Sequence, residues 1–271
     1  MNVAVVLSTY NRPKALSLVL RGLASQTEQP TEIIIADDGS TADTRILIES
    51  FCSSLPCIKH LWQPDEGFRK TRILNQAICA SKADLLIFLD GDCIPMSDFV
   101  SSHRMLYEPK VVCAGQRVLL SAGYTKRIES SANHSGQPSR SSLMWLYRYL
   151  RGDINRISPF ISLPDWGWRL SKPKDYALVR GCNFSVSRQD AIKVGGFEEQ
   201  LEGWGYEDSE FAIRLINSGL RVKSLRYSSP VLHLWHPEAS RDSEEKNRAV
   251  LNQAISNFKT CALKGLEYPV Q

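Results

Sequence analysis

Short apolar runs alternate with helically periodic segments along the first 110 or so residues of the chain. Residues 3–7 and 85–89 are continuous apolar runs, which is typical of strands covered on both faces. Between them, Pro13 suits the first turn of a helix, and the apolar residues that follow it are spaced as on one helix face. This alternation predicts an α/β fold with a mostly parallel sheet flanked by helices.

The same periodicities place the remaining elements. We expect strands at 32–36, 58–62 and 231–233, and helices at 43–52, 69–80 and 207–217, the last ended by Gly219. A final amphipathic helix is expected over 243–266. Its inward face would hold Val250, Leu251, Ala254, Ile255 and Phe258.

Composition excludes several classes of protein. A net charge of +4 over 271 residues is too weak by itself to indicate nucleic-acid binding. The seven cysteines contain no CxxC pair, so neither a zinc ribbon nor a redox motif is supported. We expect reduced cysteines in the core of a cytoplasmic protein, as at Cys79 and Cys113.

The N-terminal segment has the pattern of a strand and not of a signal peptide, because it lacks a basic lead and a cleavage site. No apolar run approaches the ~20 residues that a membrane span needs. Peripheral contact with the inner face of a membrane stays open, and so does the oligomeric state.

Polar residues cluster where three of the expected strands end, at 8–11, 37–40 and 90–92. In sheets of this kind, ligands bind beyond the carboxyl ends of the strands. No GxGxxG or P-loop follows the first strand, so a nucleotide would be held by side chains and a metal. This coincidence of polar strand ends is the strongest physical indication of a site.

Two acidic motifs stand at these ends, and each has a structural alternative. Asp90 and Asp92, separated by Gly91, could hold a hard divalent cation that keeps positions open for substrate phosphates. Asp37 and Asp38 could accept hydrogen bonds from a ribose or a base. Turn formation explains both motifs as well, because Asp and Gly favour turns.

Later in the chain, two further groups could carry chemistry. Trp204 stands between two glycines, and Glu207 and Asp208 open a helix, where either acid could deprotonate a hydroxyl or simply cap the helix. His233 and His236 bracket Trp235 after a strand. Either histidine could be the third ligand of a cation held by carboxylates, or a structural residue.

The segment 117–175 breaks the α/β pattern and is unusually basic. It holds ten Lys or Arg against four acids, a net +6 in a chain of +4, together with seven aromatic residues. A solvated insertion with its own small core would explain this, and so would a flap that binds a ligand. In the second case Trp166 and Trp168 would offer flat apolar faces to a ring such as that of a sugar, and the cations would favour an anionic ligand or an anionic membrane surface.

Six motifs follow one another along the chain: STYNRP, ADDGS, FLDGDC, GCNFSV, GGFEEQLEGWGYEDSEF and HLWHP. In this order they resemble the family 2 glycosyltransferases, which have the GT-A fold. The later motifs are most similar to the branch that includes β-1,4-galactosyltransferases, chondroitin polymerase domains and polypeptide N-acetylgalactosaminyltransferases. The resemblance covers roughly 1–115 and 178–240, and it implies one domain over 1–271. Residues 1–115 would bind the nucleotide-sugar, and residues 116–271 would bind the acceptor.

The resemblance also implies roles for individual residues. In this comparison, Asp92 is the direct metal ligand with Asp90 beside it, and His233 is the late ligand if one residue is inserted, with His236 as the alternative. Asp208 corresponds to the catalytic base. The positions expected to bind the donor are Ser8, Tyr10, Asp37, Asp38, Arg72, Asn75, Asp90 and Gly91. Those expected to contact the acceptor are Trp204, Glu207 and Asn183.

The implied reaction moves a hexose or N-acetylhexosamine from a UDP-sugar to a hydroxyl of a glycan or glycoconjugate, with Mn²⁺ or Mg²⁺ and with inversion. A retaining route remains an alternative. A nucleotidyltransferase would need a basic glycine-rich opening loop, whereas this chain offers only Arg12 and Lys14 there. An inactive sugar-binding module is disfavoured because the acids and His233 are intact.

Overall fold

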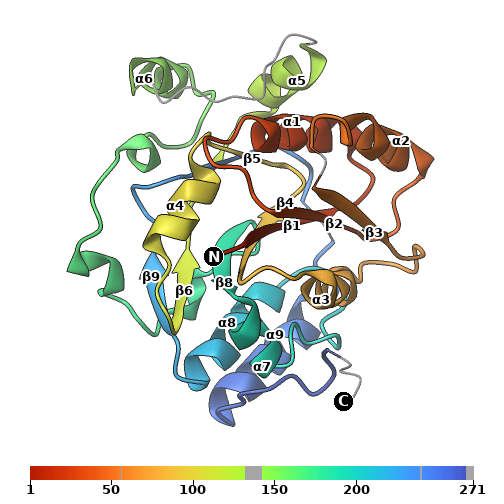
Figure 1. Ribbon diagram of the computed structural model, residues 1–271, viewed down its shortest axis with the longest axis vertical. Helices are drawn as coiled ribbons and strands as arrows, with labels where there is room; N and C mark the ends of the chain where they lie inside the picture. Colours follow the sequence, from red (N-terminus) through yellow and green to blue (C-terminus); the bar gives the residue numbers. More distant parts are fainter. Residues whose placement is uncertain (56, 132–141, 239, 267–271) are drawn as a thin grey trace.

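A computed structural model describes residues 1–55, 57–131, 142–238 and 240–266 (Figure 1). Within these residues, a seven-stranded sheet has the order β3-β2-β1-β4-β8-β6-β9. The strands β3, β2, β1 and β4 are parallel, β8 is antiparallel to β4 and β6, and β6 is parallel to β9. The predicted mostly parallel α/β sheet is confirmed. Its strands are β1 (Val3–Thr9), β2 (Glu32–Asp37), β3 (Ile58–Trp62), β4 (Leu85–Asp90), β6 (Val111–Ala114), β8 (Asn183–Ser187) and β9 (Arg221–Ser224).

Both faces of this sheet are covered, which explains the unbroken apolar runs of β1 and β4. Side chains alternate between the two faces of a strand. Accordingly Val5 and Ile87 belong to one buried cluster, and Val6 and Phe88 belong to the other. Figure 1 shows α1 and α2 on one side of the sheet and α3, α7, α8 and α9 on the other.

The helices closely match the expected positions up to residue 217. The described α-helices are α1 (Pro13–Ala24), α2 (Ala42–Phe51), α3 (Lys70–Ala80), α4 (Phe99–Leu106), α5 (Ala122–Ser130), α6 (Ser142–Leu150), α7 (Arg188–Lys193), α8 (Glu207–Asn217) and α9 (Glu244–Ser256). Short 3₁₀ turns lie at η1 (Ser158–Phe160), η2 (Gly167–Leu170) and η3 (Tyr176–Leu178). None of the helices in the described part of the chain has the length and apolar character that a membrane crossing requires.

A small second sheet adjoins the carboxyl end of β4. Its order is β5-β10-β7, with β5 (Cys93–Pro95), β10 (Val231–His233) and β7 (Arg117–Leu119). Because β10 pairs with β5, His233 lies opposite Cys93. Cys93 directly follows the motif Asp90-Gly91-Asp92, called the DxD motif below. The late histidine is thereby brought to the strand-end site from a position some 140 residues further along the sequence.

The described part of the segment 117–175 packs onto the main core. Trp145 of α6 is buried and stacks on Phe160, with ring centroids 4.1 Å apart. Tyr124 and Ile128 of α5 pack into the same cluster as α1. Residues 132–141, including the cation Arg140, lie outside the described residues.

Two expectations were wrong. The last helix ends at Ser256, ten residues earlier than expected, and Phe258 is 76% exposed with a left-handed backbone (φ 48°). Only Leu251 and Ala254 of the expected apolar stripe are buried, so the stripe is too short to extend the helix. Cys79 is exposed on α3, whereas Cys113 is buried as expected; all seven cysteines are free.

Candidate active site

The carboxyl ends of β1, β2 and β4 meet at one edge of the sheet. The strand register pairs Ser8 with Asp90 and Thr9 with Asp37, so the polar ends of these strands are direct neighbours. Gly91 has a steric role here, because a Cβ at this position would lie 2.8 Å from the carbonyl oxygen of Ser8. Its N–H donates to that same carbonyl at 2.7 Å, which holds the DxD turn against β1.

Asp90 is held by an internal network. It accepts a hydrogen bond from Ser8 Oγ at 2.8 Å and forms an ion pair with Lys70 Nζ at 2.7 Å. Burial would raise the pKa of Asp90, but the charge of Lys70 outweighs it and lowers that pKa below its usual value. Asp90 is therefore ionised and is braced by residues of β1 and α3.

Lys70 is a site residue that sequence reasoning missed. It is the first residue of α3, and its ammonium also lies 3.6 Å from Oε1 of Glu207. Burial lowers its pKa, yet the carboxylates of Asp90 and Glu207 raise it above the normal value. In the sequence, its only indication was a basic residue near the start of the helix expected over 69–80.

Asp92 lies at the centre of a second group. His233 Nε2 is 3.8 Å from Asp92 Oδ1, and His236 Nε2 is 3.3 Å from Asp92 Oδ2. Arg12 Nη1 also contacts this carboxylate, at 2.9 Å. Both predicted histidines thus converge on Asp92, and the structure does not place one in the site and the other outside it.

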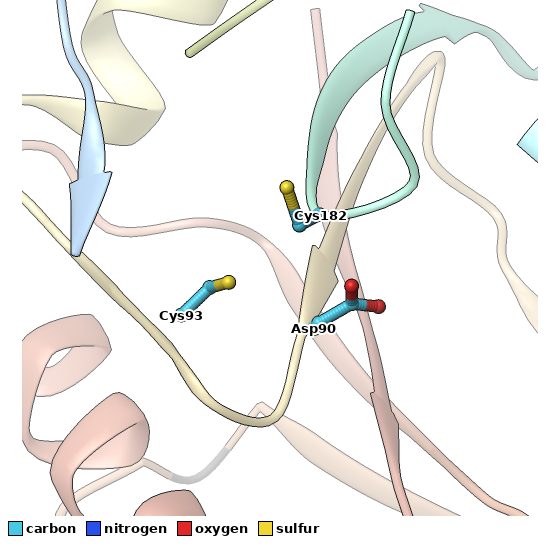
Figure 2. A group of neighbouring side chains, drawn as sticks. All are labelled: Asp90, Cys93 and Cys182. Atoms are coloured by element: carbon cyan, nitrogen blue, oxygen red, sulfur yellow. The ribbon is translucent and has the colours of Figure 1, made fainter. Parts of the chain in front are cut away.

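Two buried thiols lie beside this acidic motif (Figure 2). Figure 2 shows Asp90 and Cys93 on the two limbs of the turn that follows β4, with Cys182 on the neighbouring segment that leads into β8. Burial first, and a hydrogen bond with Cys182 second, raise the pKa of Cys93 well above its usual value. A thiol held protonated is a poor ligand for a hard cation, so carboxylate and imidazole are the donor set that this site offers.

The two acids that open α8 point to different partners. Glu207 pairs with Lys70, and burial raises its pKa. Asp208 accepts the N–H of Gly181 at 2.9 Å through Oδ2 and the N–H of Ser209 at 2.6 Å through Oδ1. Adjacent residues on a helix point about 100° apart, which accounts for this divergence.

Asp37 and Asp38, at the end of β2, form hydrogen bonds with residues of the surrounding loops. Asp37 accepts the N–H of Ser40 at 2.8 Å and lies 2.9 Å from Nε2 of His60. Asp38 accepts the N–H of Arg69 at 2.9 Å, and burial raises its pKa. Tyr10 is half-exposed and donates to Asp65 at 2.9 Å. Asp38 and Tyr10 therefore lie on neighbouring loops, and Asp37 has the contacts of a structural turn residue.

Two expected contact residues have structural partners instead. The amide of Asn75 donates to the carbonyl of Phe197 at 2.9 Å and accepts that residue's N–H at 2.7 Å. Asn183 is fully buried, where it donates to the carbonyl of Gln116 at 2.9 Å. Because these amides are used within the protein, the geometry does not support Asn75 as a donor contact or Asn183 as an acceptor contact.

Arg72 and Trp204 are exposed. Arg72 lies on the solvent side of α3. The Trp204 ring is 41% exposed and has the guanidinium of Arg241 5.2 Å from its centroid. Both side chains are accessible to a ligand, and their predicted roles remain predictions.

Comparison with known sequences places the chain in a family. Residues 4–157 match glycosyl transferase family 2, and residues 159–237 match the N-terminal domain of galactosyltransferase. The chain belongs to glycosyl transferase family 2. It is 27% identical to chondroitin synthase of Escherichia coli over 271 residues, covering 91% of this chain and 36% of that protein. It is 30% identical to validoxylamine A glucosyltransferase of Streptomyces hygroscopicus subsp. limoneus, covering 83% of this chain and 50% of that protein.

The chain therefore spans a half or less of the length of these relatives. Solved structures are similar in fold at low sequence identity. The TarS fragment 1–349 of S. aureus, in complex with UDP, has a TM-score of 0.64 at 16% identity, over 95% of this chain and 66% of that one. GalNAc-T7 with UDP, GalNAc and Mn²⁺ has a TM-score of 0.67 at 15% identity, over 96% of this chain and 49% of that one. These neighbours confirm the predicted GT-A fold.

Proposed function

We propose that this domain transfers a hexose or N-acetylhexosamine from a UDP-sugar to a glycan or glycoconjugate hydroxyl, with inversion at the anomeric carbon. The divergence of Glu207 and Asp208 carries the proposal. Glu207 lies 3.6 Å from the ammonium of Lys70 beside Asp90, whereas Asp208 accepts the N–H of Gly181. We therefore assign Asp208 to the acceptor side, and we assign Glu207, which the sequence suggested for the acceptor, to the donor side.

Asp92, His233 and His236 fit a divalent cation such as Mn²⁺ or Mg²⁺. The carboxylate of Asp92 suits Mn²⁺ or Mg²⁺, and the two imidazoles near it could complete the donor set. When bound, such a cation would neutralise charge on the diphosphate leaving group. Support comes from GalNAc-T7, which has been crystallised with UDP and Mn²⁺.

On the donor side, the chain's own residues hold the DxD acids in place. Lys70 and Ser8 fix Asp90, so its carboxylate stays ionised and cannot rotate freely. Tyr10 and Asp38 lie on the loops after β1 and β2, where the base and ribose of the donor would bind. Ligand binding beyond the carboxyl ends of these strands follows from their parallel order.

On the acceptor side, Asp208 is the proposed general base. Two backbone N–H groups donate to its carboxylate, one to each oxygen, and so fix its orientation. That carboxylate takes the proton of the attacking hydroxyl as the new glycosidic bond forms. Proton removal by a positioned side chain contributes roughly 10²–10⁴-fold to such a step.

The test is a donor panel followed by product stereochemistry. The protein would be incubated with Mn²⁺ and UDP-Gal, UDP-GalNAc, UDP-Glc, UDP-GlcNAc or UDP-GlcA, and donor contact would be read by saturation-transfer NMR. Slow UDP release without acceptor identifies the donor. The anomeric coupling constant of the product then decides the mechanism. Retained configuration would overturn inversion, and saturation transfer from GDP-sugars but no UDP-sugar would overturn the donor class.

A further inference from the structure

Four arginines, Arg117, Arg156, Arg180 and Arg226, gather at one end of the candidate active site. Among the described residues, none of the four forms a salt bridge with an acid, although Arg156 feels the charge of the other three. Its burial first, and then the charges of Arg180, Arg226 and Arg117, lower the pKa of Arg156. Guanidinium groups held this near to one another repel, and an anion between them would relieve that repulsion.

Other cations of the 117–175 segment behave differently. Arg127 and Arg148 both pair with Asp153, at 2.5 and 3.1 Å. Arg169 is buried and donates to backbone carbonyls, including that of Arg226 at 2.7 Å. Asp153 and backbone carbonyls thus account for these three cations, whereas Arg117 and Arg156 of the segment, together with Arg180 and Arg226 beyond it, form no salt bridge among the described residues.

The protein holds the cluster in place from several elements. An Nη group of Arg156 donates to the carbonyl of Arg117, while its Nε is buried with no hydrogen-bond partner among the described residues. The Arg226 guanidinium lies 4.6 Å from the centroid of the Tyr227 ring, which in turn packs 5.8 Å from Trp168. Guanidinium groups ordered in this way are suited to bind phosphate or carboxylate oxygens in pairs.

The cluster adjoins the acceptor side of the site. Arg180 directly precedes Gly181, whose N–H holds the carboxylate of Asp208. Arg117 lies on β7 opposite Val231, two residues before His233 on the neighbouring strand β10. Because residues two apart on a strand share one face, Arg117 and His233 belong to the same face of the small sheet. Arg117 therefore lies beyond β10 from β5 in the small sheet, and its side chain contacts Cys182 next to the turn that holds Asp90.

We propose that Arg117, Arg156, Arg180 and Arg226 form a subsite for an anionic group of the acceptor, a phosphate or a uronate carboxylate next to the hydroxyl that is glycosylated. This proposal rests on the function proposed above and names its acceptor class. It also specifies which part of the basic segment contacts the acceptor. The tryptophan Trp168 acts indirectly, by supporting Tyr227 beneath Arg226.

The test uses Arg156→Gln, Arg226→Gln and the double variant, with Lys174→Gln as the matched control from an exposed position in the same segment. Acceptor KM would be measured for a phosphorylated, a uronate-bearing and a neutral oligosaccharide. Each lost charge-assisted contact is expected to raise KM for an anionic acceptor about tenfold or more. KM for the neutral acceptor, and the parameters of Lys174→Gln, should stay within about twofold of the wild-type values. The acceptor that shows the larger effect identifies the anion as phosphate or carboxylate.

Two measurements keep this proposal separate from the proposed function. Binding of inorganic phosphate, followed by titration calorimetry without donor or metal, should weaken in the double variant and be unchanged in Lys174→Gln. Affinity for UDP with Mn²⁺ should stay the same in every variant. Unchanged phosphate affinity in the double variant would overturn the subsite even if transfer activity were never found. Loss of UDP affinity would also overturn it, because the arginines would then serve the donor.

Discussion

The ammonium of Lys70 joins two acids from distant parts of the chain, lying 2.7 Å from Oδ1 of Asp90 and 3.6 Å from Oε1 of Glu207. One cation thus connects the end of β4 with the start of α8, and it compensates two carboxylates that would otherwise repel each other. The side chains are largely covered, with 15% exposure at Lys70 and 16% at Glu207. Charges this sheltered interact more strongly than charges on the surface.

Replacing Lys70 should expose that repulsion. Lys70→Met leaves two partly buried carboxylates without a cation. We expect the free energy of unfolding at pH 8 to fall by about 2–3 kcal/mol. This is less than the cost of breaking a fully buried ion pair, because the site retains some solvent. Urea unfolding would measure this, with Lys70→Arg as the charge-preserving control.

The pH dependence of that loss has a definite sign. The pKa of Glu207 is already raised by burial, and removing Lys70 raises it further. A group with a raised folded pKa contributes stability that is present below its unfolded pKa and is lost as the pH rises through the folded value. The deficit of Lys70→Met should therefore be smaller at pH 5 than at pH 8. A deficit that is equal at both values would contradict this coupling.

Substitutions of Asp208 and of Glu207 should have different effects on kcat and on donor affinity. Asp208→Asn can still accept the N–H of Gly181 through its amide oxygen, so the loop should keep its place while the base is lost. We expect kcat to fall by about 10²–10⁴-fold and donor affinity to change little. Glu207→Gln is the comparison, since it removes the charge that faces Lys70. If Glu207→Gln abolished turnover and Asp208→Asn left it intact, the base would be Glu207.

The placement of the strand-end acids could be predicted because it depends on local sequence. Continuous apolar runs fix the buried strands, and parallel order brings their polar ends together, so the positions of Asp38, Asp90 and Asp92 follow from the sequence, while their roles stay predictions. The role of Lys70 could not be predicted, because one lysine at a helix start is normally a solvated cation. Its two partners lie 20 and 137 positions further along the sequence, and only the packing of α3 against the sheet unites them.

Asn75 and Asn183 show the opposite difficulty. An amide near a site can face a ligand or can satisfy buried backbone groups, and the sequence does not distinguish these cases. In both residues the second role is observed, with Asn75 bonded to the backbone at Phe197 and Asn183 to that at Gln116. Buried backbone N–H and C=O groups need hydrogen-bond partners. When these groups belong to loops that are distant in the sequence, no local sequence pattern reveals which side chain will bind them.

Asp92 should control metal affinity. Asp92→Asn removes the carboxylate on which His233 and His236 converge, and we expect Mn²⁺ affinity to fall by at least the roughly 10–100-fold typical of losing an outer partner of a metal site. Electron paramagnetic resonance of free Mn²⁺ would measure it without an activity assay. His233→Ala and His236→Ala should each weaken binding. Full transfer activity in EDTA would refute the need for a metal.

Acid stability should depend on the buried histidine His103. His103 of α4 is fully buried between Ser185 Oγ, 2.8 Å from its Nδ1, and Asn183 Oδ1, 3.0 Å from its Nε2. Burial lowers its pKa to about 4, so the folded protein keeps it neutral at a pH where the unfolded chain is protonated.

The unfolded state therefore binds more protons than the folded state between pH 6.5 and about 4, and stability must fall as the pH is lowered through this window. From the gap between its folded and unfolded pKa values, the contribution of His103 to this loss is on the order of 3 kcal/mol. His103→Gln keeps a polar side chain between Ser185 and Asn183 but cannot titrate. Its unfolding free energy should be lower than that of the wild type at pH 7, and the difference should close by pH 4. Parallel losses in the two proteins from pH 7 to pH 4 would show that carboxylates elsewhere govern acid unfolding.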